Sequence, residues 1–193
     1  MKSTPTRSLP AERPLWIFAT LWSLRQYPTK AREWSWAKKF SLIQSAGFDG
    51  IFAPPQPYVA ERGPLRYLAV TSIDDAQKIA PDLQAAKALG AVAIDIQLGD
   101  YDTPVADAIK LALRIRAVAQ ELALPFAIET HRDTFTETPE ATVALARGYR
   151  RVTKEVLPLC LDHSHFAIIR HLAPGTYWER LSEPAELLAA ATQ

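Results

Sequence analysis

Six short apolar runs, separated by longer segments of helical periodicity, constrain the fold of this chain more than any other feature. We expect strands at residues 16–22, 50–54, 66–72, 91–98, 126–131 and 157–162. Strands that alternate with helices indicate βα units built around a parallel sheet. The runs are apolar almost throughout, as parallel strands covered on both faces usually are. An open doubly wound sheet and a barrel both satisfy this α/β pattern.

Helices are expected at residues 29–46, 74–89, 104–122 and 177–191, with a further one that begins near Pro139. In the first of them, apolar residues recur every third or fourth position and include Trp34, and Gly47 then ends the helix. Asp74 and Asp75 are suited to open the second helix, since aspartate is a favoured N-cap residue. Residues 1–14 are polar and contain three prolines, so we expect a flexible arm before a single domain at 15–193.

Composition excludes several classes of function. The chain has 22 basic and 21 acidic residues, a balance that gives no electrostatic surface for nucleic acid or acidic membranes. No signal-peptide pattern and no membrane-spanning apolar stretch is found, so the expectation is a cytoplasmic protein with no membrane partner. The single cysteine, Cys160, excludes an internal disulfide. There is no G-x-G-x-x-G after the first expected strand and no P-loop, which disfavours dinucleotide and nucleotide binding.

Polar residues gather where the last two expected strands end. Glu129, His131 and Arg132 end the fifth strand, and Asp162, His163 and His165 end the sixth. Glu129 and His131 are two apart and so face the same side of a strand. In a parallel barrel the carboxyl ends of the strands form the floor of the active site.

Metal coordination is the chemistry that these residue types favour. Asp162 and His165 share a site if the chain turns after the sixth strand. Carboxylates with imidazoles suit Mn²⁺, Zn²⁺, Co²⁺ or Fe²⁺ better than Ca²⁺, and Mg²⁺ is a further candidate. Glu129 is also a candidate general base. The structural alternative is a simple ion pair between Glu129 and Arg132, with His163 in a solvated loop.

Three further residues are candidates for substrate binding. Trp22 ends the first expected strand, where an aromatic ring can pack on a sugar, and Tyr27 follows it. Gln97 ends the fourth expected strand and faces the same mouth, although a role in capping a loop explains it equally well.

The runs E-T-H-R-D, from Glu129, and D-H-S-H-F, from Asp162, resemble the xylose isomerase-like superfamily of sugar phosphate isomerases and epimerases. The resemblance implies a (β/α) TIM-type barrel that binds a divalent metal. It implies that Glu129 ligates the metal and acts as acid or base, and that Asp162 and His165 ligate the metal. His131, Arg132 and His163 would then contact the substrate.

The chain also departs from the family pattern. Barrels of this family have eight strands, with further ligands on strands seven and eight, whereas only about six βα units are recognised here. The first and sixth strands would be unpaired edges, which a second copy, another chain or the final helix would have to cover.

The function that follows is a metal-dependent isomerase or epimerase acting on a sugar, a sugar phosphate or a related hydroxy-carbonyl compound. One alternative is a truncated, non-catalytic barrel that binds a metal or a small ligand. Another is a nuclease of the apurinic endonuclease type, which the absence of histidines before His131 and of a basic excess disfavours.

Overall fold

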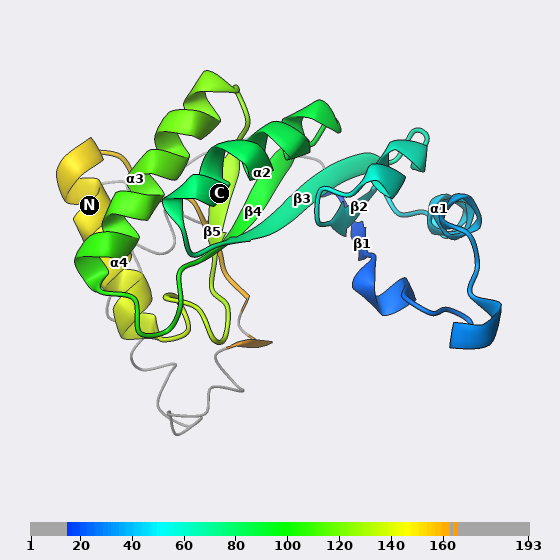
Figure 1. The fold of residues 1–193 in the computed structure, drawn as a ribbon, viewed down its shortest axis with the longest axis horizontal. Coiled ribbons are helices and arrows are strands. Elements are labelled where there is room, and N and C mark those ends of the chain that lie inside the picture. The colour runs from blue at the N-terminus through cyan, green and yellow to red at the C-terminus, as the bar shows by residue number, and fades with distance from the viewer. Residues whose placement is uncertain (1–14, 163, 166–193) are drawn as a thin grey trace, which may run out of the picture.

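The structure of the chain, a computed structural model, describes residues 15–162, 164 and 165. Six parallel strands form one sheet in the order of the sequence, as Figure 1 shows. The strands are β1 (Phe18–Thr20), β2 (Gly50–Ala53), β3 (Arg66–Ile73), β4 (Ala93–Leu98), β5 (Phe126–Glu129) and β6 (Leu159–Cys160). The expected α/β fold with a parallel sheet is confirmed. The expected arm at 1–14, His163 and the expected helix at 177–191 lie outside the described residues.

Helices connect the strands and cover the convex face of the sheet. They are α1 (Trp36–Ser45), α2 (Ala76–Ala88), α3 (Val105–Glu121) and α4 (Pro139–Thr153). Figure 1 shows α2, α3 and α4 side by side over one face, with α1 at the far end of the sheet. The carboxylate of Asp75 accepts a hydrogen bond from the Gln77 N–H at 2.8 Å, so the expected cap of α2 is confirmed.

The pairing register of the strands shows which side chains share a face of the sheet. Ile96 pairs with Ile128 across β4 and β5, and both are fully buried in the hydrophobic core. Their neighbours Asp95, Gln97 and Glu129 therefore point to the opposite face, because strand side chains alternate. The polar residues of these strands consequently share the concave face.

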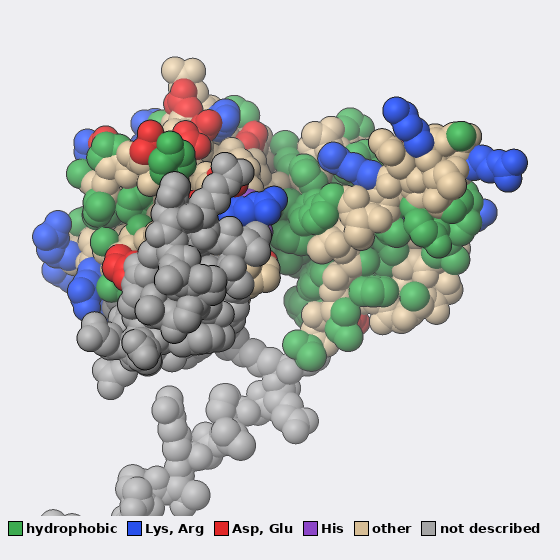
Figure 2. Space-filling model, turned by 90° about the horizontal axis from the view of Figure 1, so that it is seen from below, with side chains coloured by type: hydrophobic (Ala, Val, Ile, Leu, Met, Phe, Trp, Pro, Cys, Tyr) green, Lys and Arg blue, Asp and Glu red, His purple; other side chains and the backbone are tan. Residues whose placement is uncertain are grey.

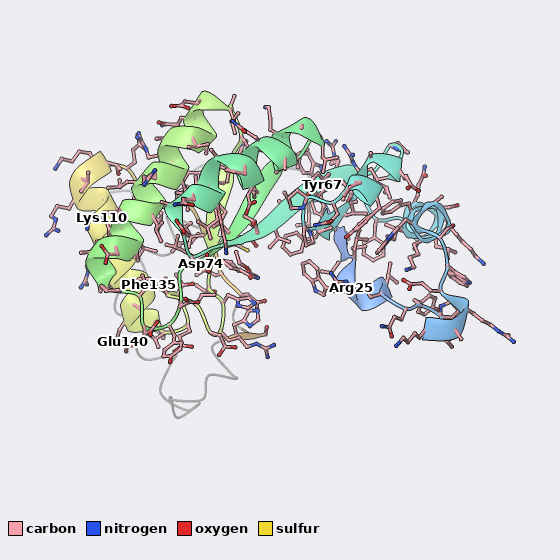
Figure 3. All side chains as sticks on the ribbon, in the orientation of Figure 1. Arg25, Tyr67, Asp74, Lys110, Phe135 and Glu140 are labelled. Carbon is pink, nitrogen blue, oxygen red and sulfur yellow. The ribbon has the colours of Figure 1, made fainter. Side chains whose placement is uncertain are left out.

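Side chains fill the space between the strands and the helices (Figure 3). Tyr67 on β3, labelled there, is fully buried. Its hydroxyl donates to the carbonyl oxygen of Ala53 on β2 at 3.1 Å, so the buried polar atom has a partner.

The N-terminal part differs from the sequence expectation. The strand expected at 16–22 is shorter, and the helix expected at 29–46 begins only at Trp36. Ser35 sets this start, because its hydroxyl accepts the Lys38 N–H at 3.4 Å as an N-cap. Trp34 is therefore not on the helix, and its ring instead meets the ring of Tyr27 edge-on at 5.1 Å.

Within the described chain, β1 pairs only with β2 and β6 pairs only with β5, so the barrel is open. An apolar cavity of about 500 Å³ lies beside β1, lined by residues that include Phe18, Leu24, Tyr27 and Leu42. Figure 2 shows hydrophobic side chains gathered on this half of the molecule, at the right of the view. The expectation that a second copy covers the open edges stays a prediction. None of the described helices is long and apolar enough to span a membrane.

Candidate metal centre

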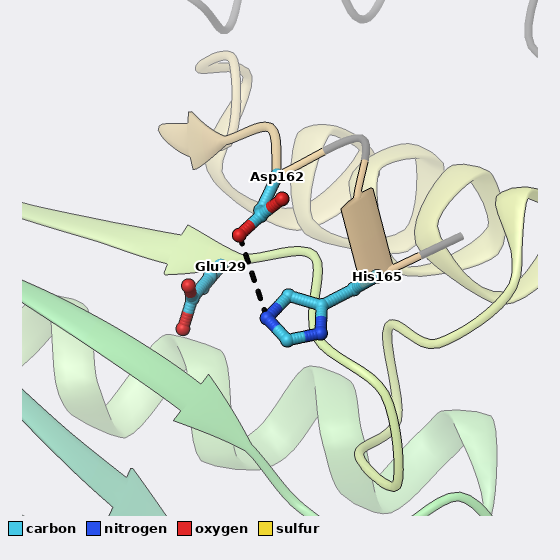
Figure 4. A group of neighbouring side chains, drawn as sticks. All are labelled: Glu129, Asp162 and His165. Atoms are coloured by element: carbon cyan, nitrogen blue, oxygen red, sulfur yellow. Dashed lines mark ion pairs between the residues drawn. The ribbon is translucent and has the colours of Figure 1, made fainter. Parts of the chain in front are cut away.

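Three predicted ligands meet beyond the carboxyl ends of β5 and β6 (Figure 4). Glu129 is the last residue of β5, and Asp162 and His165 lie in the segment that follows β6. One ligand atom from each of the three residues lies within 4.8 Å of the other two. The structure therefore brings together two carboxylates and one imidazole at the concave end of the sheet.

The turn after β6 fixes one carboxylate oxygen of Asp162 and directs the other toward His165. Oδ1 accepts hydrogen bonds from the backbone N–H and the hydroxyl of Ser164, at 2.8 and 2.6 Å. Burial works to raise the pKa of Asp162, but these hydrogen bonds outweigh it and hold the pKa below its usual value. Oδ2 instead faces Nε2 of His165, at 3.4 Å.

His165 is held as a poor proton acceptor. Burial lowers the pKa of its imidazole, and the neighbouring His131 lowers it further. The centroids of the two histidine rings are 3.9 Å apart. A neutral imidazole is the form that binds a metal, so this environment favours coordination.

Glu129 is a buried carboxyl group, with 7% of its surface exposed. Burial raises its pKa above the usual value, against the opposing effect of a hydrogen bond from Gln97. That bond joins Gln97 Nε2 to Glu129 Oε2 at 3.0 Å. A carboxyl group with a raised pKa at the floor of a cavity is suited to both accepting and returning a proton.

His131 and Arg132 lie at the rim of the same site. Nδ1 of His131 is 2.6 Å from the carbonyl oxygen of Arg132. The side chain of Arg132 is 54% exposed and its guanidinium pairs with Asp133 at 3.8 Å. In the described chain Arg132 thus has Asp133 as its ion-pair partner, and the alternative ion pair with Glu129 is not formed.

A cavity of about 620 Å³ opens over these residues. Seven of the residues that the sequence predicted for the site lie on its walls, namely Trp22, Gln97, Glu129, His131, Arg132, Asp162 and His165. Trp22 packs edge-on against Phe52, with ring centroids 5.1 Å apart. Tyr27 lines the separate cavity beside β1, so the expectation that it shares this mouth is wrong. His163 lies outside the described residues.

A group of threonines that the sequence did not single out holds the site together. Thr130, Thr134 and Thr136 are buried. The hydroxyl of Thr130 accepts the N–H of Asp162 at 2.8 Å, and Thr136 donates to the carbonyl oxygen of Glu129. The recurrence of threonine in the run T-H-R-D-T-F-T is the signal that could have found them.

Asp95 was also missed. It lies on β4, on the concave face, with 4% of its surface exposed, and its Oδ1 has no hydrogen-bond partner among the described residues. Burial, followed by the nearby charge of Glu129, raises the pKa of Asp95 to about 7. An aspartate within the apolar run A-V-A-I-D-I-Q-L was the available signal.

Comparison with known proteins identifies the fold. No family model matches the sequence, and no curated protein matches it. Solved structures do match, and one is the probable 3-DHS dehydratase AsbF, involved in petrobactin synthesis, from Bacillus anthracis. It is 17% identical, the match covers 91% of this chain and 69% of that one, and the TM-score is 0.57. The chain has an open, six-stranded part of a TIM-type barrel fold.

Two sugar epimerases share this barrel fold. The 3-keto-D-glucoside 4-epimerase YcjR from E. coli is 17% identical, over 79% of this chain and 71% of its own, with a TM-score of 0.52. D-allulose 3-epimerase from Methylomonas sp., solved in complex with D-allulose, is 18% identical, over 70% and 59%, with a TM-score of 0.52. This chain therefore spans between 59% and 71% of the length of the three neighbours.

The residues at the carboxyl end of this open barrel fit a divalent metal. Two carboxylate oxygens and one imidazole nitrogen are a donor set that Mn²⁺, Fe²⁺, Co²⁺ and Zn²⁺ accept. Such metals bind oxygen and nitrogen at roughly 2.0–2.2 Å, so any two ligand atoms of one ion lie at most about 4.4 Å apart. The three side chains, with ligand atoms within 4.8 Å of one another, lie near that spacing.

Proposed function

We propose that this chain belongs to a divalent-metal-dependent isomerase or epimerase that acts on a small hydroxy-carbonyl compound, such as a sugar or a sugar phosphate. The observation that carries the proposal is the meeting of Glu129, Asp162 and His165 on the wall of one cavity. The fold is shared with two sugar epimerases and a dehydratase, which supports the same class of chemistry.

Each residue has a distinct part in this proposal. Asp162 and His165 hold the metal together with Glu129. When bound, a divalent metal would supply a Lewis acid that polarises the substrate's carbonyl oxygen. Glu129 accepts a proton from the carbon next to that carbonyl and delivers it to the former carbonyl carbon, for which its raised pKa is suited. The hydroxyl proton moves at the same time from one oxygen to the other, so the carbonyl group shifts by one carbon.

Residues at the rim of the cavity bind the substrate. The face of Trp22, which is 43% exposed, offers an apolar surface for a sugar ring. His131 and Arg132 donate to hydroxyl or phosphate oxygens, and Gln97 and His163 complete the set that the sequence predicts. Arg132 has an exposed guanidinium that can reach an anionic group.

A second candidate function is binding of a metal or small ligand without turnover. It needs only the group of Glu129, Asp162 and His165 and no proton transfer. The two candidates share the metal centre and differ in catalysis.

Calorimetric titration with Mn²⁺, Co²⁺ and Zn²⁺ tests the centre that both candidates need. We expect about one ion per chain, with binding abolished by Glu129→Gln or Asp162→Asn. Glu121→Gln and Asp102→Asn are matched controls, because both side chains are exposed and remote from the three ligands in sequence. A protein that binds none of the three ions contradicts the proposal.

Turnover then separates the candidates. Exchange of substrate carbon-bound hydrogen with solvent deuterium, followed by NMR on a panel of ketoses and their phosphates, detects proton abstraction. Exchange that disappears in Glu129→Gln supports the isomerase, whereas metal binding without exchange supports the second candidate. Cleavage of abasic-site DNA would support the nuclease that the sequence disfavours.

A further inference from the structure

Three polar side chains form a continuous chain of hydrogen bonds across β3, β4 and β5. The hydroxyl of Ser72 donates to Gln97 Oε1 at 2.7 Å, and Gln97 Nε2 donates to Glu129 Oε2 at 3.0 Å. Register explains the alignment, because Ser72 pairs directly with Gln97 across β3 and β4. One step before Gln97 and Glu129, Ile96 pairs with Ile128. The three side chains therefore lie in one row on the concave face.

The two ends of the Gln97 amide are not equivalent in this row. Only the NH₂ end can donate to an ionised carboxylate, and the carbonyl end would repel it. A hydroxyl that donates to Oε1 keeps the carbonyl end turned toward β3. Because a hydroxyl can also accept, the acceptor-only carboxylate of Glu129 selects the amide orientation, and the bond from Ser72 to Oε1 then stabilises it.

We propose that Ser72 is a positioning residue for Glu129 and acts through Gln97. The inference rests on the proposed function, since it makes Glu129 the group whose placement matters. Gln97 then orients the carboxylate of Glu129, in addition to lining the cavity. Among the described residues, the hydrogen bonds of the Ser72 and Gln97 side chains lead to Glu129 and not to Asp162 or His165, so we expect their effect to pass through Glu129.

The size of the expected effects follows from this arrangement. Partners that orient a metal ligand are worth roughly 10- to 100-fold in metal affinity. We expect Gln97→Leu to weaken Co²⁺ binding by about 10-fold or more on this basis. Ser72→Ala removes one neutral hydrogen bond a step further out, so a loss of about 3- to 10-fold is expected. Ser72→Thr keeps the hydroxyl and should stay within about twofold of the parent protein.

A double-mutant cycle tests the route of the effect, with Co²⁺ affinity measured by calorimetry and the ligand field by visible absorption. If Ser72 acts through Gln97, the double variant Ser72→Ala/Gln97→Leu binds no more weakly than Gln97→Leu alone. Two fully additive losses, or an unchanged affinity in Ser72→Ala, overturn the proposal. Ser41→Ala, on an exposed position of α1, is the matched serine control.

A measurement on the metal-free protein separates this inference from the proposed function. The side-chain NH₂ of Gln97, assigned by ¹⁵N NMR, should exchange slowly with water in the parent and in Ser72→Thr. In Ser72→Ala the exchange should become faster and the chemical shifts should move. Identical NH₂ signals in the parent and Ser72→Ala overturn the positioning role, whether or not Co²⁺ binds. A failure to bind Co²⁺ in the parent overturns the proposed function instead.

Discussion

Asp162 Oδ2 lies 3.4 Å from Nε2 of His165, while the other oxygen of the same carboxylate is held by Ser164. The two oxygens have different partners because the chain turns directly after β6. Ser164 fixes the orientation of the carboxylate, and that orientation aims Oδ2 at the imidazole. The open space between Oδ2, Nε2 and the carboxylate of Glu129 is the proposed ion position.

Replacement of His165 by alanine should weaken Co²⁺ or Zn²⁺ binding by well over about 10-fold, because it removes the only nitrogen among the three predicted ligands. Ser164→Ala should cost less, about 2- to 10-fold, because one of two hydrogen bonds to Oδ1 remains. Calorimetric titration measures both, with Glu121→Gln as control. Equal affinity in His165→Ala and the parent would remove His165 from the ligand set.

Thr130→Val should lower both stability and metal affinity. Thr130 is fully buried and its hydroxyl accepts the N–H of Asp162 at 2.8 Å, so valine leaves that donor without a partner. An unpaired buried donor costs about 1–3 kcal/mol of unfolding free energy, measured by urea denaturation. Thr29→Val, at an exposed position, is the control. A Thr130→Val protein as stable as the parent would mean that water replaces the lost hydroxyl.

The sequence predicted the α/β class and β2 to β5 well, because their apolar runs are bounded by strong signals, whereas the strand expected at 157–162 is only two residues long, at Leu159–Cys160. Asp75 opens α2 and the runs around Glu129 and Asp162 end β5 and β6, where local chemistry and tertiary structure agree. The N-terminal part was harder. Trp34 falls on a helical spacing by chance. The hydroxyl of Ser35, the residue directly before α1, decides where the helix starts.

Local sequence signals also explain which site residues could be predicted. Glu129, Asp162 and His165 stand out because their types are rare at the ends of apolar strands. Asp95 lies inside such a strand, and only the pairing of β4 with β5 shows that it faces the concave side with Glu129. The sequence gives no signal for Ser72 either, since its contact with Gln97 depends on the register of β3 with β4.

Asp95→Asn should flatten the dependence of stability on pH. The pKa of Asp95 is 3.8 in an unperturbed chain and is raised to about 7 by burial. Between these values the folded protein binds a proton that the unfolded chain has lost, so stability falls as pH rises from about 4 to about 7 and then levels off. At roughly 1.4 kcal/mol for each pH unit, the loss is on the order of 4 kcal/mol.

Urea unfolding of the metal-free protein at pH 4 to 7 measures the free energy of unfolding and so tests this prediction. The raised pKa of Glu129 acts in the same direction, so the slope should shrink in Asp95→Asn rather than vanish. Asp102→Asn, at an exposed position, should keep the slope of the parent. A slope in Asp95→Asn equal to that of the parent would contradict a protonated Asp95 in the folded state.

Gly148→Ala should destabilise the packing of α3 against α4. Alanine in a helix is favoured over glycine by about 1 kcal/mol, but a Cβ at position 148 would overlap the Cδ1 of Ile109 and lie 2.8 Å from its Cγ1. Overpacking of this kind costs about 1–3 kcal/mol, so we expect a net loss of up to about 2 kcal/mol of unfolding free energy. Ile109→Val removes Cδ1 and should restore part of that loss in the double variant, although alone it costs about 0.5–1.5 kcal/mol. Urea unfolding of the two single variants and the double variant measures the coupling. A Gly148→Ala protein more stable than the parent would show that α3 moves away at little cost and that helix propensity dominates.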